Sequence, residues 1–225
     1  ADDSDFLEFS ENYGSATVCG HIKIEGFPVG IITNNGPIDN AGAAKATHFI
    51  HACCQSGTPI VYLQNTTGYM VGRQYEERGM VKQGSGMIQA VANARVPKFT
   101  FILGGSYGAG NYGMCGRAYS PRFLFSWPNA RTAVMGPQQA ADTMGIVMEE
   151  AAARKGVALD TAKRDALKRN IVDTFERQMS AFYTSGLLLD DGVIDPRDTR
   201  RLLCEFANLA APMRKPGPRS FGYRP

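Results

Sequence analysis

Short apolar stretches bounded by turn residues alternate with longer stretches of helical periodicity along this chain. Those in the first half predict strands over residues 16–24, 28–33, 60–63 and 96–103. Helical periodicity predicts one helix over 41–55 and a second that carries Met80, Met87 and Val91. A hairpin followed by strand, helix, strand and helix is the order of a layered α/β fold.

The second half continues with strands and then becomes strongly helical. We expect strands over 123–127 and 132–135, and a helix from Pro137 to Met148. A charged segment over 149–182 predicts helices that protrude or pack on a neighbour. A turn and short strand at 190–196, a last helix over 197–209 and a Pro- and Gly-rich tail over 211–225 complete the prediction.

The glycine-rich stretch 104–113 follows the most apolar of the predicted strands. Glycines at 104, 105, 108 and 110 predict a turn in which bare backbone approaches a ligand, with a helix starting after it. The amides of Ala109 and Gly110 would then point outward from the helix start. Unpaired N–H groups there, together with the helix dipole, are suited to an anion or a developing oxyanion.

Charge adds to this interpretation. From Arg78 to Ala141 the chain has no Asp or Glu and seven basic residues, although the whole protein carries only +3. We therefore expect a basic region beside the glycine turn and an anionic ligand.

Composition bounds the protein class. With 225 residues, 44% of them hydrophobic, the chain fits one α/β domain at roughly 100–200 residues per domain. No apolar run reaches the length of a membrane span. The first residues are acidic and show no secretory or transit signal, and five cysteines without a C-x-x-C pair suggest reduced thiols. These features predict a cytoplasmic or mitochondrial matrix protein.

Two enzyme motifs overlap the glycine stretch. Gly108 to Gly113 satisfies G-x-G-x-x-G, but a dinucleotide site also needs a carboxylate about 20 residues later. The next acidic residue is Asp142. Ser106 stands between Gly104 and Gly108 like a hydrolase nucleophile, yet no histidine follows His51 to complete a triad in that order. A purely structural turn and an anion cradle remain.

Residues 104–123, with the run G-N-Y-G-M-C-G-R-A-Y-S-P-R-F, resemble the biotin-dependent acyl-CoA carboxylases. The likeness is to the C-terminal half of their carboxyltransferase (beta) subunit and extends over nearly the whole chain. Within that family the run is more similar to the 3-methylcrotonyl-CoA and geranyl-CoA branch. Pro137, where a glycine is usual, and extra residues at 185–189 depart from the pattern.

The resemblance implies a single-domain α/β fold, the crotonase ββα-superhelix, spanning residues 1–225. It implies that biotin binds to this C-terminal domain, and that the N-terminal domain, which grips the acyl-CoA, is missing from this sequence. That domain, from the same or a neighbouring subunit, would complete the active site. Further expected partners are the biotin carboxylase and biotin carrier subunit and other copies in a homo-oligomer, with no nucleic acid or membrane.

The resemblance also implies the site residues. Ala109 and Gly110 would form the oxyanion position, and the biotin pocket would be lined by Gly105, Ser106, Tyr107, Gly108, Thr67, Gly68 and Tyr69. CO2 would pass from carboxybiotin to an acyl-CoA while two amides hold charge on the ureido oxygen, so neither a metal nor a side-chain acid or base is required.

The rival function is a self-contained crotonase-type enoyl-CoA hydratase or isomerase. That chemistry would need paired carboxylates beside the oxyanion site. The sequence from Arg78 to Ala141 contains none.

Overall fold

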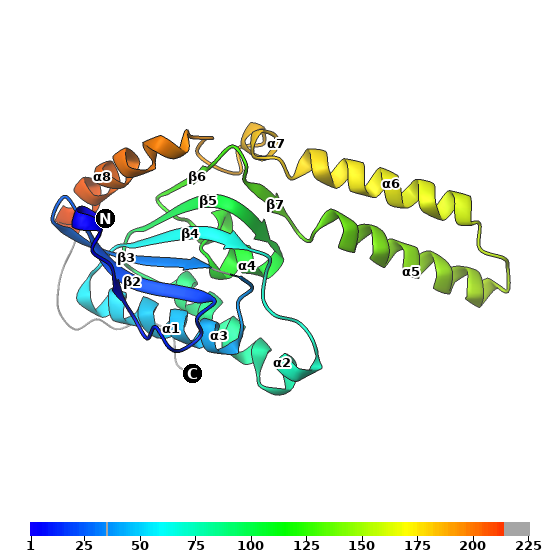
Figure 1. The fold of residues 1–225 in the computed structure, drawn as a ribbon, viewed down its shortest axis with the longest axis horizontal. Coiled ribbons are helices and arrows are strands. Elements are labelled where there is room, and N and C mark those ends of the chain that lie inside the picture. Colours follow the sequence, from blue (N-terminus) through cyan, green and yellow to red (C-terminus); the bar gives the residue numbers. More distant parts are fainter. Residues whose placement is uncertain (35, 214–225) are drawn as a thin grey trace.

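A single mixed sheet organises the protein. The computed structural model describes residues 1–34 and 36–213 (Figure 1). The strands are β1 (Leu7–Glu8), β2 (Thr17–Ile24), β3 (Phe27–Asn34), β4 (Ile60–Thr66), β5 (Lys98–Tyr107), β6 (Phe123–Ser126) and β7 (Arg131–Ala133). They lie in the order β1-β2-β3-β4-β5-β6, and β7 pairs with β5 off this path. The α/β class and the single domain are confirmed.

The type of strand pairing changes once across the sheet, from antiparallel to parallel. β1, β2 and β3 pair antiparallel, whereas β3, β4, β5 and β6 run parallel. Parallel neighbours need crossover connections, which α1 (Asn40–Ser56) and α3 (Met80–Asn93) provide. The carboxyl ends of the parallel strands therefore meet at one edge of the sheet.

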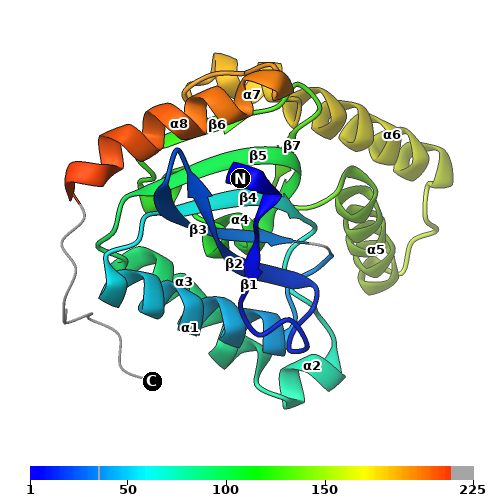
Figure 2. The ribbon, with the colours of Figure 1, turned by 60° about the vertical axis from the view of Figure 1, so that its left-hand side comes forward.

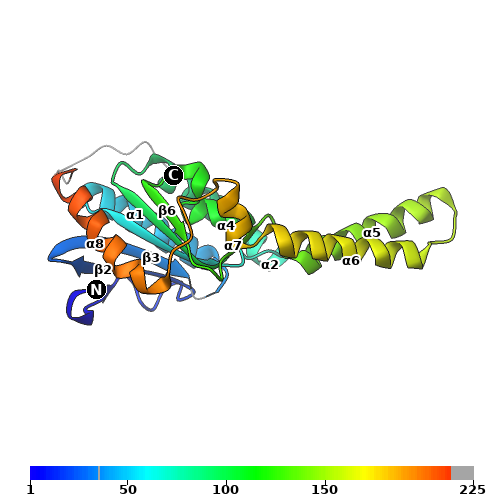
Figure 3. The ribbon, with the colours of Figure 1, turned by 90° about the horizontal axis from the view of Figure 1, so that it is seen from above.

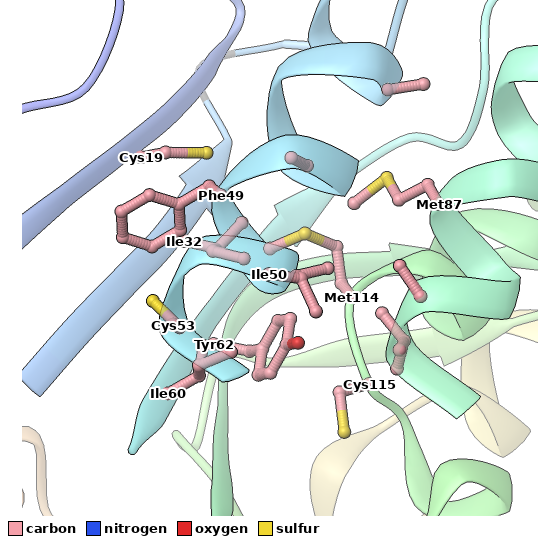
Figure 4. Close-up of a cluster of buried hydrophobic side chains, with 14 of the residues drawn as sticks. Cys19, Ile32, Phe49, Ile50, Cys53, Ile60, Tyr62, Met87, Met114 and Cys115 are labelled. Carbon is pink, nitrogen blue, oxygen red and sulfur yellow. The ribbon is translucent and has the colours of Figure 1, made fainter. Parts of the chain in front are cut away.

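Helices cover both faces of the sheet. On one face α1 and α3 pack over Ile32, Ile60 and Tyr62, all fully buried (Figure 4). On the other face α8 (Thr199–Ala210) lies across the strands (Figure 1, Figure 2), with Phe206 stacked on Phe99 at a ring distance of 4.8 Å. The periodic apolar positions of these helices explain why each lies flat on the sheet.

A helical hairpin extends away from this layered body. Helices α5 (Pro137–Lys155) and α6 (Thr161–Gln178) form an arm that points away from the sheet (Figure 1, Figure 3). Within the arm α5 buries only Ala140, Ala141 and Gly145, and α6 buries no residue. The short α7 (Ala181–Gly186) leads the chain back to the body.

Several predicted boundaries differ from the structure. The strand ending in the glycine stretch continues to Tyr107, because Gly105, Ser106 and Tyr107 pair with β7. The helix predicted to end at Met148 continues to Lys155, so the helical segment has no boundary at residue 149. The strand predicted within 190–196 is a single bridge between Ser126 and Val193.

The last predicted helix agrees more closely with the structure. The last helix begins at Thr199, after a 3-10 turn over Pro196–Asp198. Of the predicted tail over 211–225, Ala211–Met213 form a 3-10 turn, and the remainder lies outside the described residues. No helix in the described part of the chain combines the length and the apolar character needed to cross a membrane.

A buried lysine joins α3 to the start of β5. Lys98 is 8% exposed, and its Nζ donates to the carbonyl oxygens of Val91 at 3.0 Å and Tyr119 at 2.8 Å. The charge thus lies beside carbonyls at the end of a helix, where the dipole favours a cation.

Lys98→Met should destabilise the protein by about 1–3 kcal/mol, because two carbonyl groups lose a charged donor. The free energy of unfolding in urea measures this loss. Lys82→Met, on the exposed surface of α3, is the matched control and should stay within about 0.5 kcal/mol of the parent. Equal effects of the two substitutions would show that Lys98 contributes nothing through its bonds.

Candidate active site

The candidate site begins where β5 ends. Tyr107 is the last residue of the strand and caps α4 (Gly108–Gly113). Gly108 has φ +53°, a left-handed conformation that favours glycine, so the chain can pass from strand to helix within one residue. β7 pairs with β5 as far as Tyr107↔Ala133, which fixes the direction in which α4 starts.

Backbone amides are the main polar groups at this helix start. The first N–H groups of a helix lack partners within it, and Tyr107 makes no side-chain hydrogen bond that caps α4. Ala109 is exposed, whereas Gly110 is buried. The helix start can therefore donate hydrogen bonds to a ligand oxygen without help from a charged side chain.

A pocket of ≈ 500 Å³ opens at the start of α4. It lies at the carboxyl ends of β4, β5 and β7, which is where ligands bind in open α/β sheets. Six of the expected site residues line it: Thr67, Gly68, Tyr69, Tyr107, Gly108 and Ala109.

The other three expected site residues lie behind the pocket wall. The amide of Gly105 donates to Asn65 Oδ1 at 3.1 Å, so it is occupied within the protein. Ser106 is fully buried, and its hydroxyl takes part in hydrogen bonds below α4. Gly110 is buried against the loop after β4 and does not line the pocket.

Gly110 is the point at which α4 touches that loop. A Cβ atom on this residue would lie 2.8 Å from Gly68 Cα and 3.0 Å from Thr66 Cγ2. No side chain fits at these distances, so only glycine allows this approach. The two expected halves of the pocket, 67–69 and 105–110, are thereby brought together.

The prediction of a basic region beside the turn is wrong for most of its residues, although Arg131 lies opposite Gly105 in the pairing of β7 with β5. Arg95, Lys98 and Arg122 gather at the opposite end of β5, where they line a separate cavity. The ten residues of β5 separate the two ends by about 30 Å at roughly 3.3 Å per residue. Of the remaining basic residues, Arg117 pairs with Asp191 at 2.9 Å. No basic side chain is among the described residues that line the pocket.

The pocket wall has little titratable character. Burial raises the pKa of Tyr69 well above its usual value, so the phenol stays protonated at neutral pH. Its hydroxyl lies 3.5 Å from the carbonyl oxygen of Gly84. Among the described residues that line the pocket there is no Asp, Glu or His. The arrangement suits stabilisation of charge by amides more than proton transfer by a side chain.

One wall of the pocket was not foreseen from the sequence. Val134, Met135 and Gly136 line it from the segment between β7 and α5. Gln139 lines it from the first turn of α5, and Val71 from the loop after β4. The signal was present, because 132–135 was predicted as a strand, and parallel strands end at the same edge of a sheet. What was missing was the pairing of β7 with the last three residues of β5.

A second, more apolar pocket adjoins the first. It has a volume of ≈ 550 Å³, shares Gly108 and Ala109 with the first pocket, and is enclosed by α4, β7, the end of α6 and α7. Phe175, Met179 and Leu187 contribute to its walls. Ala109 therefore forms a ridge between two adjacent pockets.

Known proteins share this sequence over most of its length. The chain is 48% identical over 223 residues to the methylcrotonoyl-CoA carboxylase beta chain, mitochondrial, of Dictyostelium discoideum, covering 99% of this chain and 38% of that protein. It is 48% identical over 210 residues to the biotin-dependent 3-methylcrotonyl-coenzyme A carboxylase beta1 subunit of Mycobacterium tuberculosis, covering 93% of this chain and 40% of that protein. The chain thus spans about two-fifths of the length of these relatives.

Two solved structures also match this chain over nearly its whole length. The beta subunit of geranyl-CoA carboxylase from P. aeruginosa matches with a TM-score of 0.87 and 50% identity over 98% of this chain and 42% of that one. The transcarboxylase 12S structure matches over 100% of this chain and 42% of that one, with a TM-score of 0.82 and 27% identity. The carboxyl transferase domain family matches residues 1–221. The protein therefore belongs to the carboxyl transferase domain family.

Proposed function

We propose that this domain is the biotin-binding half of a carboxyltransferase site that carboxylates 3-methylcrotonyl-CoA or geranyl-CoA. The observation that carries the proposal is the start of α4, where amides adjoin a pocket whose described lining residues include no acidic, basic or histidine side chain. Relatives named for these two substrates are 48% and 50% identical to the chain. The crotonase ββα-superhelix is the finer fold assignment that accompanies this function.

The pocket fits the reacting end of biotin. Its volume of ≈ 500 Å³ lies within the range of about 300–1,000 Å³ that is usual for small-molecule sites. The ureido ring is uncharged and carries one acceptor oxygen, which matches a pocket with amide donors and no charged wall. Tyr107, Gly108 and the loop 67–69 would hold the ring.

When bound, carboxybiotin supplies the CO2, and its ureido oxygen carries the charge that develops. The amide of Ala109, which lines the pocket, and that of Gly110, directly behind the pocket wall, would together stabilise this charge, and the dipole of α4 would add to their effect. Because these donors belong to the backbone, the residues serve through geometry. The adjoining apolar pocket would lie on the side of Ala109 from which the acyl group approaches.

The alternative function, a self-contained enoyl-CoA hydratase or isomerase, lacks support at this site. It would require a carboxylate positioned for proton transfer. The described residues that line the two pockets at α4 include no Asp, Glu or His.

The arm and its base are the proposed contact with the rest of the enzyme. Among the described residues, 21 large hydrophobic side chains are exposed, and eleven of them lie between residues 134 and 189, including Ile146, Val147 and Phe182. Exposed apolar surface on this scale marks an interaction site. A crotonase-like N-terminal domain, which binds the acyl-CoA in the same or a neighbouring subunit, would cover this surface in a homo-oligomer.

The same assignment implies a partner subunit and a cellular location. A biotin carboxylase and biotin carrier subunit would deliver carboxybiotin to the pocket. The enzyme would act in the bacterial cytoplasm or the mitochondrial matrix, and one relative is described as mitochondrial. Neither nucleic acid nor a membrane has a role in this assignment.

Gly110→Pro in the full-length carboxylase tests the donor role of the amide. Gly110→Ala is the matched control, because it adds a Cβ at the same crowded position and keeps the N–H. We expect kcat for carboxylation of 3-methylcrotonyl-CoA to be about 100- to 1,000-fold lower in the proline variant than in the alanine variant. The added Cβ should lower kcat in both variants relative to the parent, and equal, measurable kcat values in the two folded variants would exclude the amide of Gly110 as a donor.

Ile146→Glu combined with Val147→Glu tests the proposed interface in the full-length subunit. Two carboxylates in an apolar contact carry a desolvation cost, so the oligomer should dissociate into smaller species. Analytical ultracentrifugation measures the mass. Val81→Glu, on α3 and 76% exposed, is the control and should leave the mass unchanged. An oligomer of unchanged mass in the double variant would remove the arm from the interface.

A further inference from the structure

A set of polar side chains lies directly below the start of α4, two of them fully buried and the third, Asn111, partly exposed at the second pocket. It consists of Gln64 on β4, Ser106 on β5 and Asn111 on α4. The Ser106 hydroxyl donates to Gln64 Oε1 at 2.5 Å, and Asn111 Nδ2 donates to Ser106 Oγ at 2.8 Å. Gln64 Nε2 donates to the carbonyl oxygen of Met114 at 2.7 Å. Gln64 and Ser106 have no exposed surface.

The donors and acceptors of this set are compatible with one arrangement of hydrogen bonds. Met114 O can only accept, so Gln64 must present its Nε2 there and turn Oε1 toward Ser106. Ser106 then has to donate to Gln64, which leaves its oxygen free to accept from Asn111. All three side chains are thereby held in one arrangement, as a satisfied buried network requires.

The hydrogen bonds of this network join the residues on either side of the proposed donors. Ser106 precedes Gly108, Ala109 and Gly110 in the chain, Asn111 follows them, and the two side chains join below the backbone. Gln64 also holds Met114, beyond the end of α4. A six-residue helix that contains three glycines has little stability of its own. The network supplies an attachment before, within and after this helix.

We infer that Gln64, Ser106 and Asn111 are positioning residues that fix the amides of Ala109 and Gly110 for carboxyl transfer. The inference rests on the proposed function of those amides. It changes the expected role of Ser106, since its hydroxyl is occupied below α4 and does not line the pocket. A shift of the donors by about 1 Å lowers a rate by up to roughly 100-fold.

The test is Ser106→Ala in the full-length carboxylase, with Ser126→Ala as the matched control. Ser126 is also a buried strand serine, 2% exposed, and its hydroxyl donates to Asp190 Oδ2 at 2.7 Å, away from α4. Ser106→Ala removes two hydrogen bonds between neutral groups, and Ser126→Ala removes one bond to a carboxylate, which is about twice as strong, so shifts of the thermal midpoint of the same order are expected. Only Ser106→Ala should lower kcat, by about 10- to 100-fold, with the KM for acyl-CoA within about twofold of the parent.

Asn111→Ala provides a second variant. If the two residues act through one network, Ser106→Ala combined with Asn111→Ala should have nearly the same kcat as the lower of the single variants. Effects that multiply, or a Ser106→Ala enzyme with kcat equal to that of Ser126→Ala, would overturn the inference.

The outcome is separable from that of the proposed function. If Gly110→Pro and Gly110→Ala have equal kcat values, the donor role fails and the positioning role fails with it. If the proline variant loses activity and Ser106→Ala does not, the proposed donor role of the amides stands, and only the positioning role of the three side chains is excluded.

Discussion

The pairing of β5 with its neighbours is the constraint on which the rest of the structure depends. β4 and β6 hold its first half by parallel pairing, and β7 takes over along its last three residues. Because the strand is held to its final residue, the turn at Gly108 and the direction of α4 follow from the sheet. The pocket lies where these strands and the loop after β4 end together.

Glycines in this region serve two different purposes. Gly108 adopts a left-handed backbone conformation with φ +53°, which favours glycine. Gly110 lies so close to Gly68 that no side chain fits between them. Flexible residues would leave the amides loosely placed if nothing else held them. The polar side chains below α4 compensate, because they join the flanking residues across the glycine segment.

Much of the fold could be predicted from local pattern. The strands of the first half and helices α1 and α3 follow from apolar periodicity, and the glycine stretch lies at the edge of the sheet where a pocket opens. The end of β5 was misplaced because glycines at 104 and 105 suggest a turn, whereas pairing with a distant strand keeps them extended. The charge argument failed for a related reason, since nearness in sequence does not place Lys98 near Gly108 when a strand separates them.

The pocket wall formed by Gly136 and Gln139 belongs to the first turn of α5, the helix that also forms half of the arm. The proposed pocket for a small molecule and the proposed surface for another protein therefore share one helix. A tilt of that helix on assembly would move Gly136 and Gln139 and so change the width of the pocket. Assembly and occupancy of the pocket would then be coupled, and each would alter the free energy of the other.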